Sequence, residues 1–139
     1  MKYLLDTNVI SELVAKRPSR QVIRWIDSLD ADSVYLSVIT IGELRKGIEK
    51  LPDSPRKEAL GAWLADDLLV RFGGRVLSLD VDVMLTWGAL TGRMERAGRP
   101  LPAIDSLIAA LAIHHNCNLV TRNEDDFQGT GVTVVNPWK

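Results

Sequence analysis

Two aspartates stand where a folded protein could use them for chemistry. Asp6 directly follows the apolar run 3–5, which is typical of a buried strand, and its simplest alternative role is to cap the helix that begins next. Asp105 lies in the first turn of an apolar helix, where no residue three or four positions away can pair with a carboxylate. The helix dipole alone could favour it there, but burial of an unpaired carboxylate requires protonation or a cation. Both residues are therefore candidates for a metal-binding site.

Other acids are less distinctive on their own. Glu43 lies on the polar side of a predicted helix, three residues before Lys46, and alone fits a solvated ion pair. Asn123 and the acids 124–126 follow a predicted strand and by default form a polar turn. Because ligands of parallel sheets bind outside the carboxyl ends of the strands, we expect Asp6 and this turn to share one edge. Oxygen ligands without clustered Cys or His favour Mg²⁺ or Mn²⁺, the ions of phosphodiester hydrolysis.

The elements that must position these acids follow from hydrophobic periodicity and from Gly and Pro breakers. The sequence predicts strands over 3–5, 34–36, 75–79, 118–121 and 132–135. It predicts helices over 7–17, 19–29, 41–50, 56–72, 81–97 and 103–113. Strands that alternate with helices need crossover connections, so we expect an α/β fold with a mostly parallel sheet covered on both faces.

Composition narrows the class of protein. The 139 residues fit a single domain over 1–139, and the 46% hydrophobic content excludes a disordered chain. With 17 basic and 18 acidic residues, no global basic field exists to coat nucleic acid. The single Cys117 indicates a reducing compartment. No apolar run is long enough for a membrane span, and no signal peptide is recognised, so the prediction is a cytoplasmic protein.

Four segments carry a resemblance to a known family. In order, 4–9, 37–44, 102–110 and 121–127 resemble the signature segments of PIN-domain ribonucleases, and above all those of VapC-type toxins from toxin–antitoxin systems. The ending 134–138 is similar to the FitB-like branch. Each segment alone is weakly specific, but four in the right order are fairly specific. The resemblance implies the three-layer α/β/α PIN fold with a central, mostly parallel sheet.

The resemblance also assigns residues. It implies that Asp6, Glu43 and Asp105 are the catalytic acids around Mg²⁺ or Mn²⁺. The fourth acidic position stays open between Asn123, where many relatives carry Asp, and Asp126, which precedes a phenylalanine. The remaining matches are hydroxyl or amide residues that support the acids: Thr7, Asn8, Thr121 and Asn123.

The activity implied is endoribonuclease cleavage of RNA by metal-activated water. The implied partners are a VapB/FitA-like antitoxin, a second copy in a homodimer, and promoter DNA only through the antitoxin. Among the basic groups, Arg93, Arg96 and Arg99 precede the loop to Asp105 and are the best candidates for RNA binding, although each also fits an ordinary solvated face. Lys46 and Lys50 form a further basic group.

Two alternatives remain open. A neutral Asn123 would suit a catalytically weak module that only binds RNA or an antitoxin. A haloacid-dehalogenase-like phosphatase also begins with Asp after a short strand, but its motif needs a second Asp where this chain has Asn8.

Overall fold

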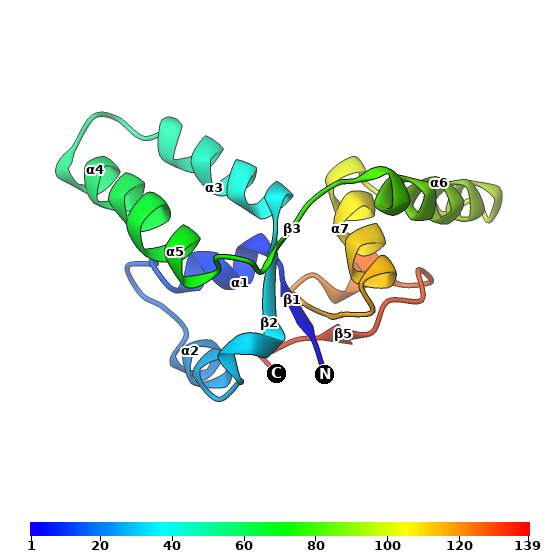
Figure 1. The fold of residues 1–139 in the computed structure, drawn as a ribbon, viewed down its shortest axis with the longest axis horizontal. Helices are drawn as coiled ribbons and strands as arrows, with labels where there is room; N and C mark the ends of the chain where they lie inside the picture. The colour runs from blue at the N-terminus through cyan, green and yellow to red at the C-terminus, as the bar shows by residue number, and fades with distance from the viewer.

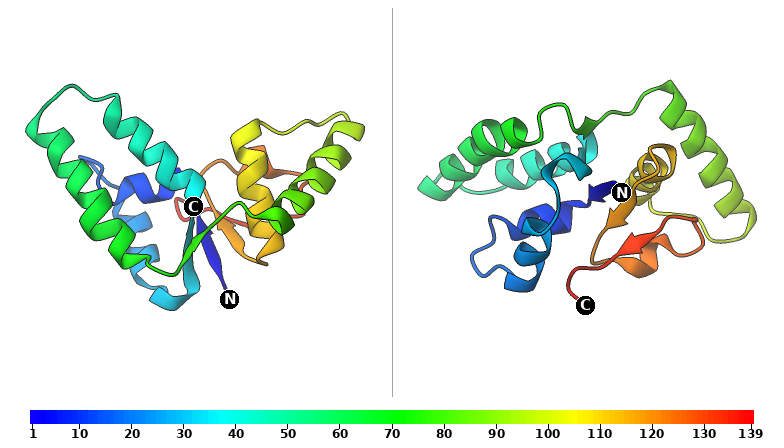
Figure 2. Two further views of the ribbon diagram at one scale, coloured as in Figure 1. Left: turned by 45° about the horizontal axis from the view of Figure 1, so that its top comes forward. Right: turned by 60° about the horizontal axis from the view of Figure 1, so that its bottom comes forward.

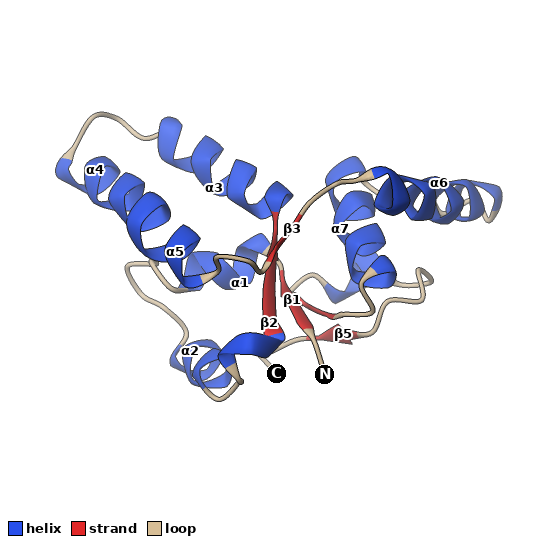
Figure 3. Cartoon of the chain, viewed as in Figure 1, coloured by secondary structure: helices blue, strands red, loops and turns tan.

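A five-stranded sheet forms the centre of the molecule. The computed structural model describes residues 1–139, and its strands are β1 (Tyr3–Leu5), β2 (Val34–Ser37), β3 (Val76–Leu77), β4 (Asn118–Val120) and β5 (Val134–Val135). They lie in the order β3-β2-β1-β4-β5, and every neighbouring pair is parallel. Figure 3 shows these short strands at the middle of a mostly helical chain. The predicted α/β fold with a parallel sheet is confirmed.

Seven α-helices connect and cover the strands. They are α1 (Thr7–Glu12), α2 (Arg20–Asp27), α3 (Val38–Glu49), α4 (Pro55–Ala62), α5 (Leu69–Arg71), α6 (Val81–Arg96) and α7 (Ala103–His114). Ser19, Ser37, Ser54 and Asp80 begin four of them, because each side chain accepts a hydrogen bond from the backbone N–H three residues later. None of these helices is both long and apolar enough to cross a membrane.

Three predicted elements differ in detail. The helix predicted over 56–72 consists of α4, a π-helical stretch from Trp63 to Leu68, and α5. The helix predicted over 7–17 ends at Glu12, well before Pro18. The segment expected to be a plain polar loop contains a 3₁₀ turn over Glu124–Phe127, which Phe127 anchors because its ring is buried.

The alternation of side chains along the strands separates two hydrophobic cores. Leu5 and Val120 face the core formed with α1 to α3 and the 55–72 region. Their neighbours Leu4 and Leu119 face the other core, formed with α6 and α7. Figure 1 and both views of Figure 2 show these two helical layers on either side of the strands. Helices therefore cover both faces of the sheet.

The carboxyl ends of the three central strands meet at one edge of the sheet. Asp6 follows β1 and caps α1, Ser37 ends β2 and caps α3, and Thr121 follows β4. The parallel register of β2, β1 and β4 brings these three residues together. Candidate site residues that are far apart in the sequence thus share one edge.

Candidate active site

Asp6 is held by two hydrogen bonds at the end of β1. Its Oδ1 accepts from the backbone N–H of Thr7 and its Oδ2 from the Thr121 hydroxyl, each at 2.8 Å. Burial raises the pKa of Asp6, the two hydrogen bonds oppose that rise, and the charges of Glu43 and Asp126 add to it. The helix-cap role and the site role are therefore compatible, since each carboxylate oxygen keeps a lone pair for another partner.

The Thr121 hydroxyl is fully used at the centre of a small network. It donates to Asp6 and accepts from Nδ2 of Asn8 and from the backbone N–H of Asn123, each at 3.2 Å. One hydrogen and two lone pairs are all that a hydroxyl offers, so its hydrogen is committed to the carboxylate. Oδ1 of Asn8 accepts from the backbone N–H of Arg122 at 3.3 Å. Asn8 therefore ties α1 to the segment after β4.

Glu43 is reached by a chain of three hydroxyls. Thr7 donates to its Oε1, and the hydroxyls of Thr7 and Thr40 lie 3.0 Å apart. Because an ionised carboxylate only accepts, Thr7 uses its hydrogen on Glu43 and accepts from Thr40, which in turn accepts from Ser37 at 3.3 Å. Lys46 forms no ion pair with Glu43. The interpretation of Glu43 as half of a surface ion pair is therefore wrong.

Sequence reasoning missed Ser37 and Thr40 as members of this network. The available signal was their spacing, because a serine at the end of a buried strand, three residues before a threonine, is typical of a helix N-terminus. Thr40 is fully buried, which is why its hydroxyl must find partners inside the protein.

Asp105 has no partner of its own. It is half-buried in the first turn of α7 and takes part in no hydrogen bond or ion pair. Burial raises its pKa from the ordinary value of 3.8 to about 6, and the charges of Asp126, Asp6 and Glu43 contribute. Residues from α3, α7 and the β1 and β4 ends thus form one acidic centre, defined here as Asp6, Glu43, Asp105 and Asp126.

Among the consecutive acids after β4, the structure separates one from the other two. Glu124 pairs with Lys139 at 2.6 Å, and Asp125 accepts from the Gln128 side-chain amide at 3.2 Å. Asp126 has no such partner, and its charge raises the pKa of both Asp6 and Asp105. Asn123 contributes its backbone N–H to Thr121, and its side chain forms no hydrogen bond. This arrangement favours Asp126 as the fourth acid.

The acidic centre suits a hard divalent cation. Its carboxylates form no ion pair with Lys or Arg, so their mutual repulsion is uncompensated within the chain. No group of three or more His, Cys, Asp or Glu side chains is arranged to hold a metal ion. A closed zinc site needs such a cluster, whereas Mg²⁺ typically binds one or two carboxylates and completes its shell with water and phosphate. The donor set therefore fits Mg²⁺ or Mn²⁺.

A groove of about 510 Å³ opens beside the acidic centre. One wall is the face of α3 that carries Glu43, and Ile104 of α7 contributes from the other side. In Figure 1, α3 and α7 rise on opposite sides of the strand ends. Of the four acids, Glu43 lines this groove, and Asp105 directly follows Ile104 in the sequence.

The three arginines predicted to bind RNA lie elsewhere. The guanidinium of Arg93 donates to the carbonyls of Gly129 and Thr130, at 3.1 and 3.0 Å. Arg99 lies against Gly129, and Arg96 is exposed on α6. None of them lines the groove beside the acids. Arg93 thus holds the loop before β5. The guanidinium groups of Arg96 and Arg99 form no hydrogen bonds of this kind.

Comparison with known proteins places this architecture in a family. A model of the PIN domain matches residues 3–132. The chain belongs to the PIN domain family. This PIN domain is 36% identical to VapC ribonuclease Y4jK of Sinorhizobium fredii, covering 98% of this chain and 97% of the relative. It is 38% identical to Toxin FitB of Neisseria gonorrhoeae, covering 97% of each protein.

Solved structures agree with the sequence relatives. The structure of FitAB bound to the IR36 DNA fragment matches this PIN domain with a TM-score of 0.94 and 36% identity, over 99% of this chain and 96% of that chain. The resemblance to VapC-type and FitB-like PIN proteins, inferred from four short segments and from the ending 134–138, is confirmed.

Proposed function

We propose that this PIN domain is a metal-dependent endoribonuclease and the toxin of a toxin–antitoxin pair. The observation that carries the proposal is the acidic centre, in which burial and the neighbouring carboxylates raise the pKa of Asp6 and Asp105 and no basic side chain neutralises any of the four acids. The names of the relatives, VapC ribonuclease and Toxin FitB, support the same activity.

Each residue has a role in the proposed reaction. Bound Mg²⁺ or Mn²⁺ supplies a Lewis acid that lowers the pKa of water and offsets the phosphate charge. Asp6 and Asp105 would hold the ion, and the Thr121 hydroxyl keeps Asp6 in one orientation. Glu43 has one oxygen bonded to Thr7 and the other free of hydrogen bonds, which supports a role in accepting a proton from the attacking water. Asp126 completes the negative field.

Control of such an enzyme would act on the same charges. A partner protein that inserts Arg or Lys among the four acids would neutralise them and exclude the cation. Solved relatives that include a toxin–antitoxin complex from Klebsiella pneumoniae and VapBC2 from Rickettsia felis bound to a DNA fragment from their promoter support an antitoxin partner and promoter binding through the complex. We also expect a homodimer of the toxin. Expression without the partner should arrest growth.

The decisive experiment uses the purified full chain, freed of any partner, with RNA in EDTA, Mg²⁺ or Mn²⁺. We expect cleavage only with a divalent cation, and its loss in Asp6→Ala and Asp105→Ala. Asp125→Ala is the matched control, because Asp125 is occupied by Gln128, and it should cleave normally.

Each contrary result has a clear meaning. Cleavage in EDTA, or full activity of Asp6→Ala, would refute the metal site. RNA that is bound but left intact would indicate a binding module, and release of inorganic phosphate would indicate a phosphatase.

A further inference from the structure

The groove beside the acidic centre has a chemically distinct wall on α3. Along this face lie Ile39, Gly42, Glu43, Lys46, Gly47 and Lys50. At 100° and 1.5 Å per residue, Lys46 and Lys50 stand within about 60° and 20° of the direction of Glu43, and about 4.5 and 10.5 Å along the axis from it. The face therefore runs from an acid at the catalytic end to two cations farther out.

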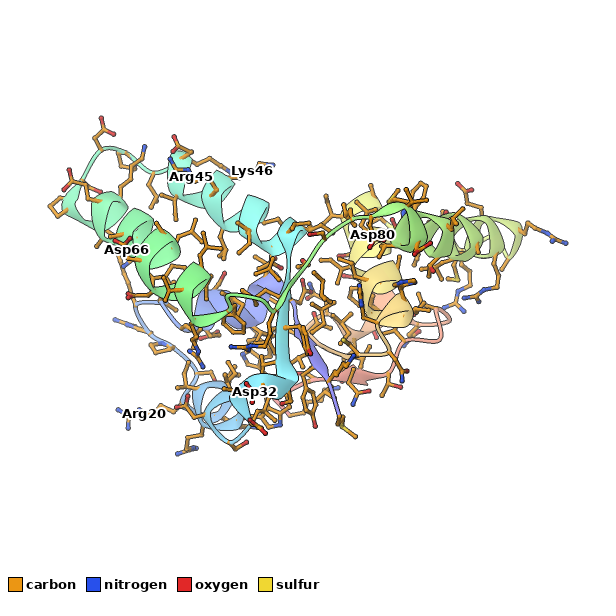
Figure 4. The ribbon with its side chains drawn as sticks, viewed as in Figure 1. Arg20, Asp32, Arg45, Lys46, Asp66 and Asp80 are labelled. Atoms are coloured by element: carbon orange, nitrogen blue, oxygen red, sulfur yellow. The ribbon has the colours of Figure 1, made fainter.

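Both lysines are free of partners. The ion pairs of the molecule are Arg45–Glu49, Lys57–Asp53 and Lys139–Glu124. Lys46 and Lys50 are exposed and belong to none of them. Arg45, which Figure 4 labels beside Lys46 on α3, is paired within its own helix and does not line the groove. Neither lysine is therefore held in an ion pair, and both can contact a ligand in the groove.

Two glycines leave the wall between these side chains bare. A Cβ atom built at Gly42 or Gly47 would meet no atom within 4 Å. Glycine inside a helix makes the helix less stable than alanine would. No other part of the chain fills the space above Gly42 and Gly47. The absent side chains allow a ligand to approach the helix backbone closely.

On the basis of the proposed ribonuclease function, we propose that this α3 face binds a single-stranded segment of RNA and guides its backbone into the acidic centre. Lys46 and Lys50 contact phosphates and act as positioning residues. The bare helix surface at Gly47 accommodates the sugar–phosphate chain, and the half-exposed Ile104 offers apolar contact to a base. The occupant is a single strand because one helix presents one row of cations.

The charge gradient along the groove gives the binding a direction. Phosphates are attracted at the Lys50 end and repelled by the carboxylates at the Glu43 end. Only a phosphate whose charge is offset can rest beside the acids. The lysines therefore hold the flanking phosphates, and the phosphate to be cut is the one that reaches Glu43.

The test compares Lys46→Gln/Lys50→Gln with Arg45→Gln in the full chain. Binding of a single-stranded oligoribonucleotide is measured by fluorescence anisotropy in EDTA, where the RNA stays intact, over a series of salt concentrations. Loss of two phosphate contacts should weaken binding about tenfold and reduce the log–log salt slope by about 1.4. Arg45→Gln should leave the slope unchanged.

Kinetics and metal binding separate this proposal from the activity itself. In Mg²⁺, the double variant should raise KM while kcat stays within about twofold, and its affinity for Mn²⁺ in calorimetry should be that of the parent protein. Because binding is measured without cleavage, an inactive enzyme would refute the proposed function and leave the lysine result intact.

A second variant acts on shape rather than on charge. Gly47→Leu should be at least as stable to heat as the parent protein and should weaken RNA binding about tenfold, because its side chain occupies the bare surface. An unchanged salt slope in the double lysine variant, or equal losses in Arg45→Gln, would overturn the proposal. The proposal would also be overturned if the double lysine variant bound RNA normally and lost affinity only for an acidic protein partner.

Discussion

The Thr121 hydroxyl donates a hydrogen bond of 2.8 Å to Oδ2 of Asp6, a residue 115 positions away in the sequence. Thr121 is fully buried, and the same hydroxyl accepts two hydrogen bonds from Asn8 and Asn123. The bond joins the segment after β4 to the end of the central strand. Thr121 therefore orients Asp6, although the two residues are far apart in the sequence.

Replacing Thr121 with valine keeps the volume of the side chain but removes the hydroxyl. The side chain of Asn8 and the backbone N–H of Asn123 lose a partly buried acceptor, which should cost about 1 kcal/mol in the free energy of unfolding. Asp6 loses its orienting bond, so Mg²⁺-dependent cleavage should fall about 10- to 100-fold. Urea unfolding and single-turnover cleavage measure the two effects. Thr121→Ser restores the donor and should recover most of the activity; equal losses in both variants would contradict an orienting role.

Asp126 should matter more to activity than its neighbours. Asp126→Ala should lower cleavage and Mn²⁺ affinity about tenfold or more, because its charge acts on Asp6 and Asp105. Asp125→Ala and Asn123→Ala should both remain close to the parent protein. Initial rates at several Mn²⁺ concentrations provide the comparison. A larger effect of Asn123→Ala would move the fourth position to the amide.

Arg93 should behave as a structural residue. Arg93→Gln removes two hydrogen bonds to the carbonyls of Gly129 and Thr130, and should lower the free energy of unfolding by about 1 kcal/mol. Arg96→Gln, on the same helix and without such bonds, should leave stability unchanged. Chemical unfolding of the two variants decides this, and a stability loss confined to Arg96→Gln would contradict the role given to Arg93.

The stability of the metal-free protein should fall as pH rises through the titration of Asp105. Its pKa is raised from 3.8 to about 6, so between about pH 4 and 6 the folded state binds more protons than the unfolded state. Stability from this residue is therefore greatest at low pH and is lost as the folded carboxyl ionises. The change should be about 1 kcal/mol, because solvent screens a half-buried group.

Asp105→Asn provides the matched comparison for this pH effect. The variant cannot ionise at this position, so its stability should fall less between pH 4.5 and 7.5 when both proteins are unfolded by urea in EDTA. Added Mg²⁺ should stabilise the parent protein most at pH 7.5, where the carboxylates are charged and bind the ion. Identical pH dependence in the two proteins would show that Asp105 does not carry the effect.

The elements of the fold could be predicted because each has a local signal. The strand 3–5 is a short buried apolar run, and apolar residues at helical spacing mark α3, although it begins three residues earlier than predicted, after the Ser37 cap. The π-helical stretch Trp63–Leu68 had no such signal, because its apolar and polar residues are spaced as they would be in an α-helix. Its geometry depends on how Leu64 and Leu68 pack in the core.

The acidic centre was predictable only in part. Asp6 and Asp105 were found from their position and their lack of local partners, whereas helical periodicity alone placed Glu43 on a solvated surface. What brings Glu43 inward is the hydroxyl of Thr7, which lies on another helix. Contacts of this kind join residues far apart in the sequence, so they become visible only when the register of the sheet is known.

The position of β1 at the centre of the sheet has a consequence for synthesis of the chain. β1 is made first, but one of its two neighbours is β4, more than 110 residues later, and Asp6 is oriented only when Thr121 arrives. Non-local strand pairing of this kind forms late in folding. A nascent chain that has left the ribosome only as far as α7 therefore carries three of the four acids without a complete active centre. An enzyme that attacks RNA would in this way stay inactive beside the ribosome until its own translation is nearly finished.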